Sequence, residues 1–334
     1  MNRSAVIDKV KVIVTGGCGF IGHHFVEHLI KNTDWDIIVL DKLSYSSCGF
    51  ERLRDTGLLG NERLSVFPVD LSNKISNGLI YELGDINYIF HLAADTHVDH
   101  SISDPVGVVT NNIMSTLHIL EYARKLKNLK LLLYFGTDEV YGEVGDHLFT
   151  ENERHNPGNP YSASKSGAEQ LCVSYTKTFN LPIIRVNVMN VFGERQHVEK
   201  FIPKIIFKLL NNQEIDIYTN EEGEIGSRYY IHARNVAAAV LFIIQKGTIG
   251  ECYNIMGEKE ISNLEMVEFI ANVLGVDYKH KLSSGIRPGN DFKYGLDGSK
   301  LSNLGWELPK DFVNSLTKTI NWTIEYKDWL SYYY

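Results

Sequence analysis

The amino-acid sequence predicts an α/β protein with a doubly wound, mostly parallel sheet and a smaller mixed α/β unit after it. Three observations support this prediction. Apolar runs rich in Val, Ile and Leu alternate with longer amphipathic segments over residues 11–188, as in repeated βα units. A cluster of glycines directly follows the first run. Beyond residue 189 the alternation stops, so we expect a sheet domain at 1–188 and a partly interleaved second domain at 189–334.

The composition limits the class of protein. Of the 334 residues, 44% are hydrophobic and 22% charged, as in ordinary globular proteins. A net charge of −8 without a basic run argues against nucleic-acid or membrane-surface partners. No apolar run approaches the roughly 20 residues that cross a bilayer. Four scattered cysteines and an N-terminus without a signal-like apolar stretch predict a cytoplasmic protein with reduced thiols.

The first βα unit predicts a dinucleotide site in a Rossmann-type sheet. A strand is expected at Lys11–Thr15 and a helix from the glycines to about residue 31. Glycines between them permit a tight turn, bring the backbone close to a pyrophosphate and let the helix pack on the strand. The alternative is a turn that needs glycine for its conformation alone. The expected cofactor contacts are Gly16, Gly19, Phe20, Ile21 and Gly22.

The next three strands add candidate cofactor contacts. A strand at 36–40 ends at Asp41, at the spacing of a ribose-binding acid. Because this carboxylate would repel a 2′-phosphate, we expect NAD and not NADP, a preference that Lys42 weakens. The strand at 64–70 ends in residues near the expected adenine, and the strand at 88–94 ends in alanines that allow close approach of a flat ligand, although plain turns and helix packing are alternatives. These residues are Asp70, Leu71, Ala93 and Ala94.

Two segments after the fourth strand have simpler interpretations. The polar loop 95–100 lacks the helical His pair and third ligand of a zinc site, so no metal is expected and the loop is solvated or lines the substrate. Residues 106–127 form an amphipathic helix over the sheet. Its expected buried face is Val106, Val109, Ile113, Leu117, Leu120 and Ala123, and its polar face is Asn111, Asn112, His118, Glu121 and Lys125.

The fifth strand carries two adjacent acids. Residues 130–135 are expected to be buried, and Thr137, Asp138 and Glu139 follow. Carboxyl ends of parallel strands meet at one edge of a sheet, so these acids should share a cleft with Gly16 and Asp41. Neighbouring carboxyl groups in such a cleft are suited to acid–base chemistry.

Tyr161 and Lys165 are separated by one helical turn on one face of a predicted helix. An ammonium beside a phenol stabilises the phenolate and lowers its pKa from near 10, which makes Tyr161 a candidate general base. The alternative is an ordinary amphipathic helix with these residues in the core.

The second half of the chain contains cations suited to a diphosphate. Short strands are expected at 226–231 and 253–257, a helix after residues 199–203, and a turn at 287–291. Lys200, Arg228 and Arg287 are candidates for phosphate contacts, although each taken singly is more commonly a surface ion pair. The aromatic segment from Trp306 is expected to pack.

Together these motifs resemble the extended short-chain dehydrogenase/reductase superfamily. The glycine loop and the Tyr161-x-x-x-Lys165 pair are general to it. Segments 91–99, 137–142, 160–165, 199–203 and 287–291 resemble the nucleotide-sugar 4,6-dehydratases, over nearly the whole chain. The triplet Thr137-Asp138-Glu139 is the most specific motif, because related epimerases have Ser or Ala in place of the acids and decarboxylases keep only the Glu.

The resemblance implies an NAD-dependent lyase of deoxysugar biosynthesis. Such an enzyme would convert dTDP-glucose or UDP-glucose to the 4-keto-6-deoxyglucose nucleotide and water, by oxidation of C4 with NAD, elimination across C5 and C6, and hydride return to C6. Tyr161, aided by Lys165, takes the C4 hydroxyl proton, and Thr137 binds the C4 oxygen. Glu139 removes the C5 proton, and Asp138 protonates the leaving hydroxyl. An epimerase or decarboxylase, or a non-catalytic NAD-binding regulator, is the alternative.

The resemblance also implies contacts beyond the catalytic set. The nucleotide diphosphate would be held by Asn190, Lys200, Arg228, Asn254, Arg287 and Tyr294. Two chains would form a homodimer by packing the 106–127 helix and the Tyr161 helix of each into a four-helix bundle. Three positions depart from the pattern, namely Gly136 for Ser, Asn290 for His and Asn111 for Thr, and the choice of dTDP or UDP stays open.

Overall fold

A parallel sheet organises the larger part of the structure, a computed structural model that describes residues 9–145, 147–220, 222–284 and 293–331. Within these residues, seven strands are paired in the order β10-β6-β5-β4-β1-β2-β3. The doubly wound Rossmann-type prediction is confirmed, because the chain order reverses between β1 and β4. The strands are β1 (Lys11–Thr15), β2 (Asp36–Asp41), β3 (Leu64–Pro68), β4 (Tyr88–His91), β5 (Leu131–Thr137), β6 (Ile183–Val188) and β10 (Cys252–Ile255).

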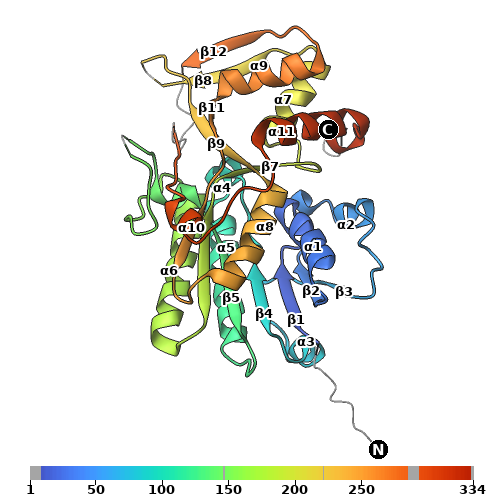
Figure 1. The fold of residues 1–334 in the computed structure, drawn as a ribbon, viewed down its shortest axis with the longest axis vertical. Helices are drawn as coiled ribbons and strands as arrows, with labels where there is room; N and C mark the ends of the chain where they lie inside the picture. Colours follow the sequence, from blue (N-terminus) through green and yellow to red (C-terminus); the bar gives the residue numbers. More distant parts are fainter. Residues whose placement is uncertain (1–8, 146, 221, 285–292, 332–334) are drawn as a thin grey trace, which may run out of the picture.

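Helices cover both faces of this sheet (Figure 1). One face packs α1 (Phe20–Asn32), α8 (Ala233–Lys246), α2 (Glu51–Asp55) and α10 (Ser299–Asn303). The other packs α3 (Asn77–Leu83), α5 (Pro105–Ala123) and α6 (Pro160–Phe179). Because both faces are covered, the central strands are buried along nearly their whole length, as in β1 and β5. Short helices η1 (Tyr45–Ser47), α4 (Val98–Ser103) and η2 (Asp138–Tyr141) follow β2, β4 and β5.

The smaller unit lies at the carboxyl edge of the sheet, in the upper part of Figure 1. It contains a sheet of β7 (Asn190–Phe192), β9 (Ser227–His232) and β11 (Glu260–Ser262), and a parallel pair of β8 (Ile215–Thr219) and β12 (His280–Ser284). Its own apolar core involves α7 (Phe201–Leu210), α9 (Asn263–Leu274), α11 (Phe312–Glu325) and α12 (Asp328–Ser331). Between β9 and β11 the chain returns through α8 and β10 to the large sheet, so the two units share chain segments.

The buried face of helix α5 differs in part from the predicted one. Val106 is 74% exposed and Val109 37% exposed, although both were expected to face the sheet. Asn112, expected on the polar face, is instead buried. Its amide accepts from the Asp95 backbone N–H at 2.8 Å and donates to Ser164 Oγ at 2.9 Å. Leu120 and Ala123 are buried as predicted, but the prediction for Val106, Val109 and Asn112 was wrong. For Asn112 the reason is that satisfied hydrogen bonds allow a polar side chain to face a core, which hydrophobic periodicity does not register.

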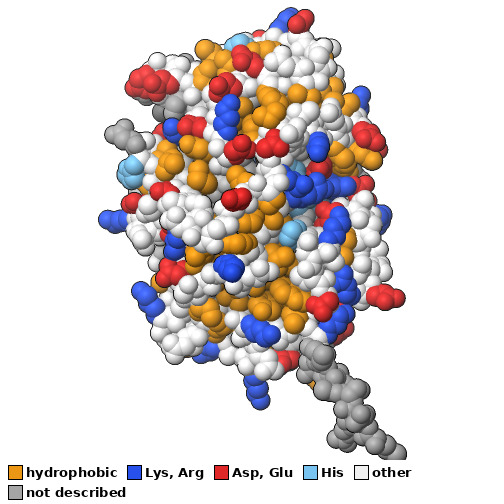
Figure 2. Space-filling model, in the orientation of Figure 1, with side chains coloured by type: hydrophobic (Ala, Val, Ile, Leu, Met, Phe, Trp, Pro, Cys, Tyr) orange, Lys and Arg blue, Asp and Glu red, His pale blue; other side chains and the backbone are white. Residues whose placement is uncertain are grey.

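The surface is mixed in charge. On the face in Figure 2, the described Lys and Arg side chains are interspersed with Asp and Glu. None of the helices in the described ranges is long and apolar enough to cross a membrane.

Candidate active site

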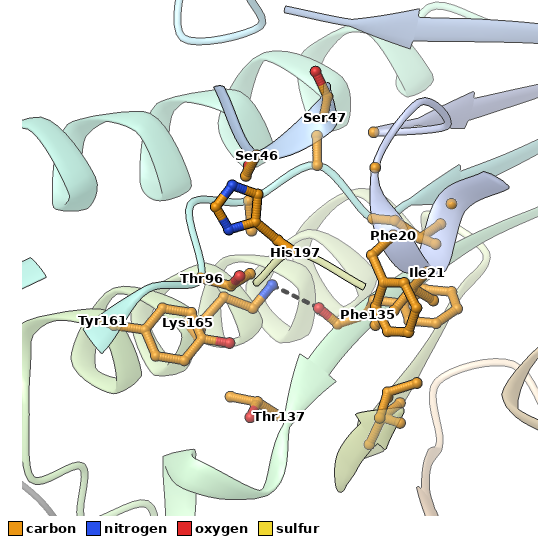
Figure 3. A pocket seen from close by; sticks show the side chains of 18 of the residues that line it. Phe20, Ile21, Ser46, Ser47, Thr96, Phe135, Thr137, Tyr161, Lys165 and His197 are labelled. Carbon is orange, nitrogen blue, oxygen red and sulfur yellow. Dashed lines mark hydrogen bonds between the residues drawn. The ribbon is translucent and has the colours of Figure 1, made fainter. Parts of the chain in front are cut away.

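A cavity of about 330 Å³ opens where the carboxyl ends of the strands meet the smaller unit (Figure 3). Most of the residues predicted from the sequence line it, although they come from eight separate regions of the chain. Those residues are Gly16, Gly19, Phe20, Ile21, Gly22, Asp41, Leu71, Ala93, Ala94, Thr137, Asp138, Glu139, Tyr161, Lys165, Asn190 and Lys200.

The glycine loop is shaped for close backbone approach. Gly16 has a φ of +69°, and a Cβ there would lie 2.9 Å from the Cα and N of Ala93. A Cβ at Gly22 would lie 2.0 Å from the Gly16 carbonyl oxygen. Helix α1 begins directly after Gly19, so its first turn adjoins the cavity. A helix N-terminus reached by side-chain-free backbone fits the pyrophosphate of a dinucleotide.

Asp41 stands at the end of β2, facing the same cavity. Its Oδ2 accepts from the Cys18 backbone N–H at 3.0 Å, and its Oδ1 accepts from the Leu43 N–H at 2.8 Å. Burial raises the pKa of Asp41, and these two hydrogen bonds oppose that rise. Lys42 is engaged elsewhere, with Nζ 3.0 Å from Asp95 Oδ2 and 2.9 Å from Asn111 Oδ1. The neighbouring ammonium is therefore paired with a carboxylate of its own.

A buried network joins β1 to β4 below the cavity. Thr15 Oγ1 lies 2.8 Å from His91 Nδ1 and accepts from the Ala93 backbone N–H at 3.1 Å. The other ring nitrogen of His91 lies 3.0 Å from Thr116 Oγ1. Burial lowers the pKa of His91 to about 3, so the ring is neutral at physiological pH. This network fixes the small residues Ala93 and Ala94 at the point where the strand order reverses.

The acids follow β5 at once, in the short helix η2. Thr137 is the N-cap of η2, and its Oγ1 accepts from the Glu139 backbone N–H at 3.4 Å. The same hydroxyl donates to Asp138 Oδ1 at 3.1 Å. Burial, and then the charge of Glu139, raise the pKa of Asp138 to about 7. A substantial fraction of Asp138 is therefore protonated at neutral pH, so this group can donate a proton.

Tyr161 and Lys165 occupy the first turns of α6, opposite the acids. Figure 3 shows both beside Thr137. Lys165 Nζ donates to the Phe135 carbonyl oxygen at 2.6 Å and lies 4.5 Å from the centre of the Tyr134 ring. Burial lowers the pKa of Lys165 to about 8.

The Tyr161 phenol departs from the expectation. We predicted a lowered pKa, but burial and the Glu139 charge raise the pKa of Tyr161, while its hydrogen bond with Thr137 acts in the opposite direction. The reason is that the surrounding carboxyl groups and low polarity both oppose a second negative charge.

Gly136 explains one departure from the dehydratase pattern. A Cβ at this position would lie 2.0 Å from the Oδ1 of Asn187 on the paired strand β6. The Asn187 amide donates to the Tyr141 hydroxyl at 2.9 Å. With Asn187 in this orientation, a serine at position 136 has no room.

The predicted diphosphate contacts divide into two groups. Asn190 and Lys200 line the cavity, and Lys200 Nζ donates to the Thr96 carbonyl at 3.1 Å. Arg228 does not line it, but its charge lowers the pKa of Asp138 and its guanidinium lies 4.6 Å from the Tyr294 ring centre. Both of these residues are therefore close to the catalytic end.

Two further predicted residues, Asn254 and Asp70, do not line the cavity. Asn254 is fully buried, and its amide donates to the Phe149 and Asp297 carbonyls at 3.0 and 3.1 Å, which ties two loops together. Asp70 accepts from the Ser72 backbone N–H at 2.9 Å and is absent from the lining. Arg287 and Asn290 lie outside the described residues.

The cavity also recruits residues that the sequence did not single out. Ser44, Ser46 and Ser47 line it after β2, in the polar run that follows Asp41. Gln196 and His197 line it from the segment before α7, close to Glu199 of the 199–203 segment already noted in the sequence. A run of hydroxyl side chains next to a ribose-binding acid was the available signal for the first group. Nothing in spacing identifies the second group, because it belongs to the smaller unit.

Across the described residues, no cluster of three or more His, Cys, Asp or Glu side chains is arranged to hold a metal ion. The donors gathered in the cavity are those of a dinucleotide and acid–base site.

Comparisons with known proteins agree with this geometry. Residues 12–255 match the model of the NAD dependent epimerase/dehydratase family. The chain is 34% identical to the dTDP-glucose 4,6-dehydratase of Escherichia coli, over 96% of this chain and 95% of the relative. The crystal structure of the dTDP-glucose 4,6-dehydratase DesIV from Streptomyces venezuelae, with NAD bound, has a TM-score of 0.87 at 30% identity and covers 96% of this chain and 98% of its own.

Epimerases of the same fold are also similar. The UDP-N-acetylglucosamine 4-epimerase of Methanobrevibacter ruminantium has a TM-score of 0.84 at 29% identity, covering 95% of this chain and 99% of its own. Family matches and structures thus agree with the cavity on an NAD-dependent enzyme of the Rossmann type. The chain belongs to the NAD-dependent epimerase/dehydratase family.

Proposed function

We propose that this chain is a dTDP-glucose 4,6-dehydratase, an NAD-dependent hydro-lyase. The observation that carries the proposal is the pair of adjacent acids, Asp138 and Glu139, placed on η2 beside Tyr161 and Lys165. An oxidoreductase site of this type needs a Tyr and a Lys for hydride transfer at a carbinol. Removing water from the hexose needs an additional acid and base, and the pKa of Asp138, raised to about 7, suits the acid.

The cofactor end supports NAD. The glycine loop would hold the pyrophosphate, and Asp41 the adenosine ribose. Bound NAD supplies the hydride acceptor for oxidation at C4 and the hydride donor for reduction at C6. Lys42 is paired with Asp95, and the negative charge of Asp41 would disfavour a 2′-phosphate.

The transfer of the C4 hydroxyl proton involves Tyr161, Lys165 and Thr137. Tyr161 accepts the C4 hydroxyl proton as the hydride leaves, and Thr137 orients the C4 oxygen by a hydrogen bond. The buried ammonium of Lys165, held by the Phe135 carbonyl, stabilises the Tyr161 phenolate that accepts this proton. Once C4 is a carbonyl, the C5 proton is α to it and becomes acidic.

Glu139 and Asp138 then carry out the elimination. Glu139 removes the C5 proton, and Asp138 donates its proton to the C6 hydroxyl, which leaves as water. The two groups divide the roles because neighbouring carboxyl groups do not ionise together, and the Glu139 charge contributes to the raised pKa of Asp138.

The nucleotide would lie toward the smaller unit. We place its diphosphate near Asn190 and Lys200, which line the cavity, and near Arg228. The sequence-based contacts Asn254 and Arg287 stay predictions. Identity to relatives named for dTDP-glucose favours thymidine over uridine, and so makes dTDP-glucose the substrate to test first.

Purified protein incubated with dTDP-glucose and UDP-glucose side by side tests the proposal. We expect a 4-keto product, detected by its alkali-induced chromophore, with the higher kcat/KM for dTDP-glucose. Epimerisation at C4 without loss of water would instead assign the chain to the epimerase branch, which shares this fold. Binding of NAD without turnover of any nucleotide hexose would assign it to a regulator.

The same proposal includes a homodimer built on α5 and α6. These helices pack against each other, and Val106 and Val109 on α5 and Phe179 on α6 expose apolar surface. Sedimentation velocity should give twice the mass of 37.9 kDa, and Val109→Glu should lower it. A monomer in the wild-type protein would contradict this part. The cytoplasmic location stays a prediction.

A further inference from the structure

Arg52 is a fully buried cation at the edge of the cofactor site. It is 0% exposed, although it lies on the short helix α2. Arginine is rarely buried without several acceptors for its five N–H groups. Here the acceptors are backbone carbonyls from three different segments. Nε donates to Arg195 O at 3.0 Å, and Nη1 donates to Ser46 O at 2.8 Å and reaches Cys18 O at 3.5 Å.

Each of these segments forms part of the cavity. Cys18 belongs to the glycine loop, and its N–H binds the Asp41 carboxylate. Ser46 lies in η1 and lines the cavity. Arg195 precedes the cavity-lining residues Gln196 and His197. One guanidinium therefore joins the three loops that surround the expected adenosine and pyrophosphate end.

The positive charge of Arg52 also favours cofactor binding. Burial raises the pKa of Asp41, and Arg52 is among the groups that oppose this rise. A ribose-binding carboxylate must be ionised to accept hydrogen bonds from both hydroxyls. A buried cation close to the glycine loop also favours the negative pyrophosphate.

Two C-terminal helices contact Arg52 and its neighbour Arg195 through tryptophan side chains. The Arg52 guanidinium lies 5.6 Å from the Trp329 ring centre on α12. A second arginine repeats the arrangement, because Arg195 lies 4.7 Å from the Trp322 ring centre on α11 and pairs with Asp55 of α2. Arg195 has a φ of +66°, so this segment adopts a backbone conformation that non-glycine residues rarely take.

We propose that Arg52 is a positioning residue for the cofactor, and that α11 and α12 keep it in place through the two arginine–tryptophan contacts. Arg52 touches no reacting atom. It fixes the glycine loop, η1 and the 195–197 segment in the geometry that binds NAD, and so couples the far C-terminal helices to cofactor retention. The inference builds on the proposed function only in taking NAD as the ligand.

NAD affinity and the rate of NAD release, measured without any sugar nucleotide, test this inference. We expect Arg52→Met to raise the NAD Kd by about tenfold, as the loss of hydrogen bonds from a charged group predicts. We expect Trp329→Leu to raise it about threefold, in the range of a cation–π contact. At saturating NAD, the kcat of both variants should stay within about twofold of wild type, since the catalytic groups are intact.

Two matched variants serve as controls. Arg54→Met removes an exposed arginine of the same helix that pairs with Glu51. Trp306→Leu removes a tryptophan that packs on Phe242 of α8, away from the arginine contacts. Both should bind NAD like the wild type.

Wild-type NAD affinity in Arg52→Met overturns the proposal, and so does an equal loss of affinity in Arg54→Met. If circular dichroism shows that Arg52→Met is unfolded, Trp329→Leu decides, and an unchanged Kd and release rate then overturn it. Because the NAD affinity and release rate are measured without hexose, a failure of the dehydratase assignment leaves these two measurements unaffected.

Discussion

The Thr137 hydroxyl donates a hydrogen bond to Asp138, with 3.1 Å between Oγ1 and Oδ1, and both side chains are buried. The contact orients the Asp138 carboxyl group. It also lowers the pKa of Asp138, but burial and the Glu139 charge outweigh it and leave the pKa at about 7. The four predictions that bear on the reaction and its cofactor follow from this arrangement and from the glycine loop.

Asp138→Asn keeps the shape of the side chain and removes the transferable proton. We expect water loss from dTDP-glucose to slow by about 10²- to 10⁴-fold, while oxidation at C4 persists. Mass spectrometry of quenched single-turnover reactions measures the two steps separately. Asp34→Asn, on the exposed turn after α1, is the control and should react normally. Water loss at the wild-type rate in Asp138→Asn would refute the acid role.

The pH dependence of the elimination follows from two groups. Asp138 donates only in its neutral form, which prevails below its pKa of about 7, so the rate should fall as pH rises through this value. Lys165 loses its charge near pH 8, which should add a second decrease. One unit above the pKa of Asp138, the rate should be about tenfold lower. The profile of kcat in Asp138→Asn should lack the decrease near pH 7, and its persistence would assign it to another group.

Glu139→Gln removes the proposed base and leaves its volume unchanged. With C4 oxidation intact, the C5 proton should no longer exchange with solvent. Nuclear magnetic resonance of sugar nucleotide recovered from deuterated water reports this exchange directly. Glu143→Gln, just after η2, should exchange normally. Deuterium at C5 in the Glu139→Gln reaction would show that a different group removes the proton.

Gly22→Ala tests the glycine loop by sterics alone. Its Cβ would lie 2.0 Å from the Gly16 carbonyl oxygen, so the loop must shift and NAD binding should fall by more than about tenfold. Gly78→Ala is the control, at an exposed position of α3 where the closest contact of the new Cβ is 4.0 Å away. This change should raise the free energy of unfolding by about 0.5–1 kcal/mol. Calorimetric titration with NAD and thermal unfolding check the pair. If Gly22→Ala bound NAD as tightly as the wild type, the predicted clash with the Gly16 carbonyl would be contradicted.

Asn112→Ala tests the correction to the buried face of α5. The change leaves the Asp95 backbone N–H and the Ser164 hydroxyl without their buried partner, so the free energy of unfolding should fall by about 1–3 kcal/mol. Asn73→Ala removes an exposed amide and should stay within about 0.5 kcal/mol of wild type. Urea unfolding of both variants measures the difference, and equal stability would mean that Asn112 is not held as described.

The sequence alone was sufficient to predict the fold and to select candidate catalytic residues that line one cavity. These features are local patterns, which an amino-acid sequence shows directly. They are the strand–glycine–helix order, the alternating βα units and the positions of Asp41, Asp138, Tyr161 and Lys165. The rule that ligands bind at the carboxyl ends of parallel strands then brings Gly16, Asp41 and Thr137 to one edge. For these residues, position in the topology implies position in space.

Only the tertiary structure decided the environment of each group. Burial and the Glu139 charge set the pKa of Asp138 and raise that of Tyr161, because both depend on distances between segments that the sequence keeps apart. Asn112 is buried although its side chain is polar, because hydrogen bonds satisfy its amide group. Arg52 reads as an ordinary surface arginine close to Arg54, yet it is buried and contacts Trp329 of the C-terminal helix α12, whereas Arg54 is exposed. Solvation and long-range contact have no local signal in the sequence.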